Sequence, residues 1–127
     1  MAQTTYFFNL ALHSKAIRLD ASSADFLMGV NQTLVLHLFP RADYSDLLQA
    51  YEKAEPLSQA VLEVVADNPY YVKLRDAKAI DMKARDPRSI MWNEGRLPPH
   101  ARHYPGIYEL TVAFGQMETA NGRYRPG

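Results

Sequence analysis

The sequence predicts an α+β domain, a two-layer sandwich in which a small, mostly antiparallel sheet packs against two to four helices. Strand-like runs rich in β-branched and aromatic residues occur toward both ends of the chain. Between them, apolar residues recur at helical spacing, and a proline divides this stretch in two. The 127 residues fit a single domain, because a chain of this length buries roughly two-thirds of the surface it exposes when unfolded.

The N-terminal third predicts a hairpin, a short helix and a central strand. Residues 4–12 place large apolar side chains on one face, and residues 15–20 continue the alternation after a short connection. A serine pair followed by an aspartate resembles a helix cap, which predicts a short helix over 22–31. The continuous apolar run 33–39 predicts a strand covered on both faces, with His37 as a neutral core histidine satisfied by one hydrogen bond.

The middle of the chain predicts two consecutive helices and a strand. Apolar residues at helical spacing indicate a helix over 43–55, which the Glu55-Pro56 step should end. A second helix is expected over 56–68, with Pro56 in its first turn. Residues 70–75 alternate as a half-exposed strand with a basic polar face. Residues 76–85 suit either a short helix, which we favour, or an extension of that strand.

The last third is organised around an excursion at residues 86–105. This stretch holds four of the eight prolines and the only tryptophan. Long loops in compact domains are usually functional or disordered, and its apolar residues favour an ordered loop on the surface. A strand is expected over 106–116. The tail could form a hairpin turn at Asn121-Gly122 with a short edge strand, or it could fray.

Composition excludes several classes of protein. The chain has no cysteine, which removes disulfide scaffolds, thiol catalysis and cysteine-based zinc sites and suits the cytoplasm. It has no secretory signal pattern and no apolar run of the ~20 residues that span a bilayer, so we expect a soluble protein with no membrane partner. The formal net charge is zero, but residues 1–68 carry four Lys/Arg against eight Asp/Glu, and residues 69–127 carry ten against six. This asymmetry hints at an acidic partner for the second half, although the two halves could equally neutralise each other in the folded domain.

Sequence motifs give no support for catalysis. The chain contains no phosphate-binding GxxxxGK[ST], no GxGxxG, no GxSxG and no HExxH pattern. We therefore lean away from an enzyme and expect no cofactor.

A protein-binding role is the favoured prediction. Tryptophan, tyrosine and arginine are enriched at interaction hot spots because they combine large buried area with directional polar groups. Such residues, with two histidines, gather within the 92–104 loop, and prolines there would lower the entropy lost on docking. The predicted partner-binding residues are Trp92, Arg96, His100, Arg102, His103 and Tyr104. The chain would then be a protein-interaction module such as a phage- or bacteria-encoded inhibitor or adaptor, and a homodimer would fit the same features.

Two alternatives stay open. Region 70–104 mixes cations with flat aromatic rings, which is typical of nucleic-acid binding. Its candidate cations are Lys73, Arg75, Lys83, Arg85 and Arg88. Against it, the chain's isoelectric point is only about 6.9, whereas nucleic-acid modules are usually strongly basic. The other alternative is a small enzyme or metal protein using His100 and His103, which would need a further ligand.

Overall fold

The computed structural model describes residues 4–39, 45–84 and 107–125 and shows a closed β-barrel. It contains eight strands and one short helix in these ranges. In chain order the elements are β1 (Thr5–Leu12), β2 (Lys15–Met28), β3 (Gln32–Leu38), α1 (Ser45–Glu52), β4 (Pro56–Val65), β5 (Tyr70–Arg75), β6 (Ala77–Ala84), β7 (Ile107–Ala113) and β8 (Gln116–Asn121). The predicted α+β sandwich with two to four helices is therefore wrong.

Six strands close the barrel. They follow the order β1-β2-β3-β7-β6-β4, and antiparallel pairing of β4 with β1 completes the circle. The hairpin β5–β8 extends this sheet from β4. All the strand pairs are antiparallel. Because closure pairs every barrel strand on both sides, β8 is left as the exposed edge among the described strands.

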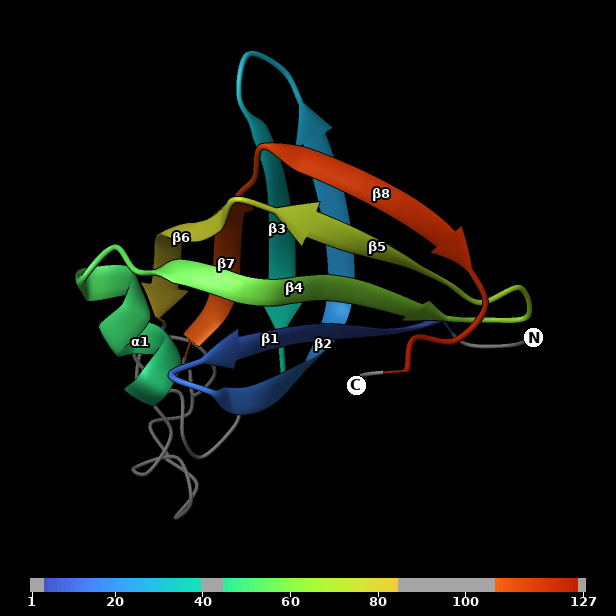
Figure 1. The fold of residues 1–127 in the computed structure, drawn as a ribbon, viewed down its shortest axis with the longest axis horizontal. Helices are drawn as coiled ribbons and strands as arrows, with labels where there is room; N and C mark the ends of the chain where they lie inside the picture. Colours follow the sequence, from blue (N-terminus) through green and yellow to red (C-terminus); the bar gives the residue numbers. More distant parts are fainter. Residues whose placement is uncertain (1–3, 40–44, 85–106, 126–127) are drawn as a thin grey trace, which may run out of the picture.

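The strands lie in two layers that cross each other (Figure 1). Strands β1, β4, β5 and β8 run across the front, and β2, β3 and β7 run crosswise behind them. The long strand β2 belongs to both layers, since its first half pairs with β1 and its second half pairs with β3. Helix α1 sits at one end of the front layer, and the β2–β3 hairpin projects beyond the rest of the molecule (Figure 1).

The core fills the space inside the barrel. Every strand from β1 to β7 sends alternate apolar side chains inward, among them the fully buried Phe8, Leu34, Leu36 and Leu110. Helix α1 adds Leu47 and Ala50 to this same cluster. The predicted helix at 43–55 is thus confirmed in its existence, although it is short.

Three of the predicted helices are strands, and each contains a bulge. In β2, Ala21 pairs with Leu38 and Ser23 with His37, so one extra residue lies between them. Leu19 and Ala21 face the core before this bulge, whereas Ala24 and Phe26 pack toward it afterwards. The change from odd to even positions resembles helical spacing, which explains the wrong helix at 22–31.

The same phase change explains the helix predicted at 56–68. In β4, Leu57 faces the core, Gln59 adopts a positive φ of 52°, and the inward positions then become Ala60, Leu62 and Val64. The register against β1 shifts at this point. Strand β6 has a bulge between Ala79 and Asp81, so the strand alternative for 76–85 holds and the favoured helix there is wrong.

Two sharp corners lie side by side where the paired strands β5 and β8 continue into the paired strands β6 and β7. Strand β5 passes into β6 at Asp76, whose φ is 57°, and β7 passes into β8 at Phe114-Gly115. The two corners touch, because the Gly115 amide donates a hydrogen bond of 2.8 Å to the Arg75 carbonyl. A side chain at Gly115 would approach Asp76 Oδ2 to 3.0 Å, which explains the glycine there.

The strands predicted at 4–12, 15–20, 33–39, 70–75 and 106–116 are all confirmed, with 15–20 forming the first half of β2 and 106–116 covering β7 and the start of β8. The tail differs from its prediction. The edge strand β8 precedes Gly122 rather than following it, and residues 122–125 fold back over β5 and β4 as a segment without regular structure. We call residues 122–125 the C-terminal arm.

Candidate protein-binding surfaces

The predicted docking loop lies outside the described residues. This holds for Trp92, Arg96, His100, Arg102, His103 and Tyr104, and also for Arg85 and Arg88 of the nucleic-acid alternative. Lys73, Arg75 and Lys83 are described, and the structure separates them. Lys73 and Arg75 line a groove at β5, whereas Lys83 lies on β6 and pairs with Glu109 at 3.3 Å.

An apolar patch marks the projecting end of the β2–β3 hairpin. Leu27 and Met28 at the end of β2 are 56% and 57% exposed, and Val30 in the turn is fully exposed at 102%. Ile80, at the bulge of β6, is 47% exposed. Val30 and Ile80 line one hollow and so lie together, whereas Leu27 and Met28 are successive strand residues that point to opposite faces of the hairpin. Met28 shares its face with Phe26, which packs against the core. Exposed apolar residues that lie together are typical of an interaction surface. We call Met28, Val30 and Ile80 the tip patch.

A shallow hollow lies within the tip patch. It has a volume of about 360 Å³ and is lined by Val30, Asn31, Gln32, Ile80, Ala113 and Phe114. The hairpin is held here by Phe26, whose ring meets that of Phe114 edge to face at 5.8 Å. The exposed end is therefore anchored to the core through an aromatic pair, which reduces the flexibility lost when a partner binds.

A larger groove opens where β4 changes partners. Pro56 and Leu57 of β4 pair with β6, and from Ala60 onward β4 pairs with β5. The intervening bulge faces the corner at Asp76 and leaves a groove of about 780 Å³. It is lined by Pro56, Leu57, Ser58, Gln59, Ala60, Val61, Lys73, Leu74, Arg75, Asp76, Ala77, Tyr124 and Arg125. We call it the basic groove.

The rim of the basic groove is cationic and its floor is apolar. Three cations, Lys73, Arg75 and Arg125, face one carboxylate, Asp76, which leaves a formal charge of +2. All four side chains are exposed. The apolar side chains of the floor are Pro56, Val61 and the Tyr124 ring, above the core residues Leu57, Ala60 and Leu74. Such a surface favours a ligand that combines negative charge with apolar side chains.

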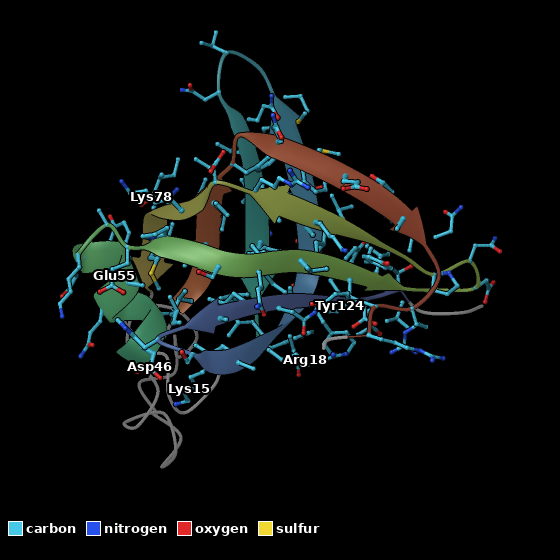
Figure 2. All side chains as sticks on the ribbon, in the orientation of Figure 1. Lys15, Arg18, Asp46, Glu55, Lys78 and Tyr124 are labelled. Atoms are coloured by element: carbon cyan, nitrogen blue, oxygen red, sulfur yellow. The ribbon has the colours of Figure 1, made fainter. Side chains whose placement is uncertain are left out.

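A buried carboxylate holds one wall of this groove. Glu63 points outward from β4 but is only 1% exposed. Arg123 Nε donates to its Oε2 at 3.0 Å, and Arg18 Nη2 lies 2.9 Å from its Oε1 as an ion pair without hydrogen-bond geometry. Arg18 also stacks over the Phe7 ring at 3.9 Å. Glu63 thereby ties the C-terminal arm to β2 across β1 and β4, and Figure 2 shows Arg18 and Tyr124 on this part of the surface.

The C-terminal arm has two further attachments. The Gly122 amide donates to the Pro69 carbonyl at 2.8 Å, at a φ of 99° that suits glycine. The Tyr124 ring lies 5.3 Å from that of Tyr71 on β5. These contacts fix Tyr124 and Arg125 beside the groove.

A polar ladder crosses the outer face of the back layer. Ser23, His37, Glu109 and Lys83 are successive cross-strand partners on β2, β3, β7 and β6. Ser23 Oγ lies 2.7 Å from His37 Nδ1, and His37 Nε2 lies 3.2 Å from Glu109 Oε2. The prediction that His37 is a core histidine with one hydrogen bond is wrong, since its side chain is 42% exposed and has two partners.

The polar ladder resembles a Ser-His-Glu catalytic arrangement only in part. In a catalytic triad the serine contacts Nε2 of the imidazole and the carboxylate contacts Nδ1. Here the two are exchanged, because Ser23 contacts Nδ1 and Glu109 contacts Nε2. Lys83 also pairs with the Glu109 carboxylate, at 3.3 Å. We interpret the polar ladder as cross-strand pairing that stabilises the sheet.

Among the described residues, no group of three or more His, Asp or Glu side chains converges as a metal site. His100 and His103 of the metal alternative lie outside this part of the chain. No helix in the described ranges combines the length and apolarity that crossing a membrane requires.

Sequence reasoning missed the tip patch and the arm. A signal for the patch was present, because Val30 stands between glycine and asparagine, two residues typical of turns. A large aliphatic residue in a turn has no core to enter. Nothing in the tail indicated that Tyr124 would fold back onto Tyr71, because that contact depends on the position of β8 in the sheet.

Comparison with known proteins gives a likeness of fold. No protein-family model matches the chain, and neither does any curated protein. A solved structure described as the crystal structure of Hcp protein superimposes with a TM-score of 0.59, covering 98% of this chain and 99% of its own. The two sequences are 10% identical. The chain is thus similar to that protein in its fold.

Proposed function

We propose that this barrel is a protein-interaction module and that its partner is a second copy of the same chain. Within the residues that the structure describes, the contact surface is the tip patch. The observation that carries the proposal is the pair of exposed aliphatic side chains, Val30 and Ile80, that line one hollow. Covering apolar surface stabilises a complex by about 25 cal/mol per Å² removed from water. The anchored hairpin presents this surface beyond the rest of the molecule (Figure 1).

Charge supports a second copy as the partner. The formal net charge is zero, so two copies do not repel each other at long range. Charges of both signs occur on the strands that carry the patch, because Lys78 and Asp81 lie within two residues of Ile80 on β6 and Asp25 lies on β2. A contact related by a two-fold axis brings each surface against itself, and a rim of mixed sign can then pair Lys78 with an aspartate of the other copy.

Sedimentation velocity over a range of protein concentrations tests the proposal. The wild type should form species heavier than the 14.4 kDa monomer as concentration rises. Val30→Asp should remain monomeric, because a carboxylate would be buried in the contact. The matched control is Tyr70→Asp, since Tyr70 is an exposed large side chain at the start of β5, outside the patch. It should assemble like the wild type.

Two outcomes contradict the proposal. One is a wild type that sediments as a monomer at every concentration reached. The other is a Val30→Asp variant that assembles as the wild type does. The partner-binding role predicted for residues 92–104 stays a prediction, because those residues lie outside the described ranges.

We do not propose nucleic-acid binding as the main function. Only Lys73 and Arg75 of its candidate cations share a described surface, and Lys83 is engaged by Glu109. The chain as a whole carries no net positive charge.

A further inference from the structure

We infer that the basic groove is a second binding site, which takes an extended acidic segment of polypeptide carrying alternate aliphatic side chains. The site is distinct from the tip patch and goes beyond the proposed self-association. It lies on the front layer between β4, β5 and the C-terminal arm, where Figure 2 shows Tyr124.

The rim of the basic groove carries cations that form no ion pair with a carboxylate of the described residues. Lys15, Arg18, Lys83 and Arg123 each form an ion pair with a carboxylate within 4.0 Å. Lys73, Arg75 and Arg125 have no such pair with any carboxylate in the described ranges; the contact that Lys73 makes is a distant one, 6.0 Å from the Tyr71 ring centre. These three cations line one groove together with Asp76, and Glu118 stands opposite Lys73 on β8, so the rim keeps an excess of one positive charge when both carboxylates are counted. A ligand with carboxylates would supply the missing partners.

The lining of the basic groove also includes apolar side chains. Leu57, Ala60, Leu74 and Ala77 belong to the core beneath the groove, and its apolar side chains are Pro56, Tyr124 and Val61, which stands opposite Lys73 on the same face. Aliphatic side chains of a ligand can pack against these three. In an extended peptide, successive side chains point to opposite sides. Alternating acidic and aliphatic residues therefore direct carboxylates toward the rim and apolar groups toward the floor.

The C-terminal arm forms a wall of the groove that is already fixed by contacts within the chain. Glu63 holds Arg123, Pro69 accepts the Gly122 amide, and Tyr71 contacts Tyr124, so the wall formed by the arm is in place before a ligand arrives. A wall that is already ordered reduces the entropy lost on binding.

A nucleic acid would also place negative charge on the rim, but it fits less well. Phosphates would meet the cations and a base could stack on Tyr124, yet the aliphatic floor offers nothing to a phosphate backbone. The neutral chain also lacks the broad basic surface that such binding usually uses. We therefore assign the site to a peptide and use an oligonucleotide as a competing probe.

Fluorescence anisotropy with labelled probes tests the site on the full chain at low salt. The probes are a short peptide of alternating glutamate and leucine, the same length with glutamate and serine, the same length with lysine and leucine, and a single-stranded oligothymidylate. The glutamate-leucine peptide should bind most tightly, and its affinity should fall as salt screens the rim. The serine version should bind more weakly because it leaves the floor uncovered.

Variants localise the binding. Lys73→Glu combined with Arg75→Glu should weaken the glutamate-leucine peptide by at least about tenfold, since two attractive pairs become repulsive. Lys53→Glu is the matched control, because Lys53 is exposed just after α1 and does not line the groove, and it should bind like the wild type. Tyr124→Phe and Tyr124→Ala, checked for an unchanged melting temperature, report on the arm; only the alanine variant should bind more weakly.

Several results would overturn the assignment. These are no binding of the glutamate-leucine peptide at low salt, equal binding of the lysine-leucine peptide, equal loss of affinity in Lys53→Glu, or tighter binding of the oligonucleotide. Val30→Asp should leave peptide binding unchanged, and the double charge reversal should leave sedimentation unchanged. Failure of this site and failure of the proposed self-association are therefore distinguishable.

Discussion

Arg123 donates a hydrogen bond of 3.0 Å from Nε to Oε2 of Glu63, a carboxylate 60 residues earlier in the chain and almost completely buried in β4. A buried carboxylate is costly unless its charge is compensated. Two arginines share that task here, and both keep their own outer surface in water, with 43% and 54% of the side chain exposed. The pairing joins the tail to the barrel wall.

The first prediction concerns this carboxylate. Glu63→Gln keeps the shape of the side chain but removes its charge, so both arginines lose a charged partner. We expect a loss of about 1–3 kcal/mol in the free energy of unfolding, the range for hydrogen bonds to charged groups. Urea denaturation measures it. Glu118→Gln on the exposed strand β8 is the control, and it should change stability by less than about 0.5 kcal/mol. Equal losses in the two variants would show that Glu63 is not a stabilising contact.

The second prediction compares two neighbours on β3. Leu36 is fully buried, and Leu36→Ala should cost about 2–5 kcal/mol because it leaves a cavity in the core. His37 belongs to the polar ladder on the outer face, and His37→Ala should cost less than about 1 kcal/mol. Chemical denaturation of both variants checks the difference. A larger loss for His37 would mean that the ladder contributes more than ordinary cross-strand pairing.

The third prediction concerns the touching corners. Gly115→Ala should lower the free energy of unfolding by about 1–2 kcal/mol, since the new methyl group would meet Asp76 Oδ2 at 3.0 Å. Asp76→Gly removes that atom and also suits the φ of 57°. In the Asp76→Gly background, Gly115→Ala should cost close to nothing. The same cost in both backgrounds would contradict the proposed contact.

The positions of strands with regular alternation could be predicted from the sequence. Residues 4–12 and 70–75 keep one phase across their core-facing positions, and both were assigned correctly. The region over 56–68 was assigned to a helix although it contains three valines, which favour strands. The bulge at Gln59 moved the inward positions by one residue, and an apolar pattern that changes phase once is hard to distinguish from a helical period over so short a window.

The surfaces were less predictable than the strands. Lys73 and Arg75 were identified as basic residues on one strand face, and they do share a groove. Their neighbours Tyr124 and Arg125 come from the end of the chain, and they reach the groove only because β8 pairs with β5. Contacts of this kind depend on strand order, and local sequence patterns do not encode strand order.

Closure of the barrel has a consequence for the newly made chain. Strand β3 pairs on one side with β7, and the ladder contact between His37 and Glu109 spans 72 residues. While the chain is being synthesised, β3 therefore has an open edge until β7 has left the ribosome. Pairing between segments so far apart is slow, because the ends of a long loop must first meet. The barrel should thus close only after β7 has been synthesised, and the interval in which β3 is unpaired is when the nascent chain is most prone to aggregate.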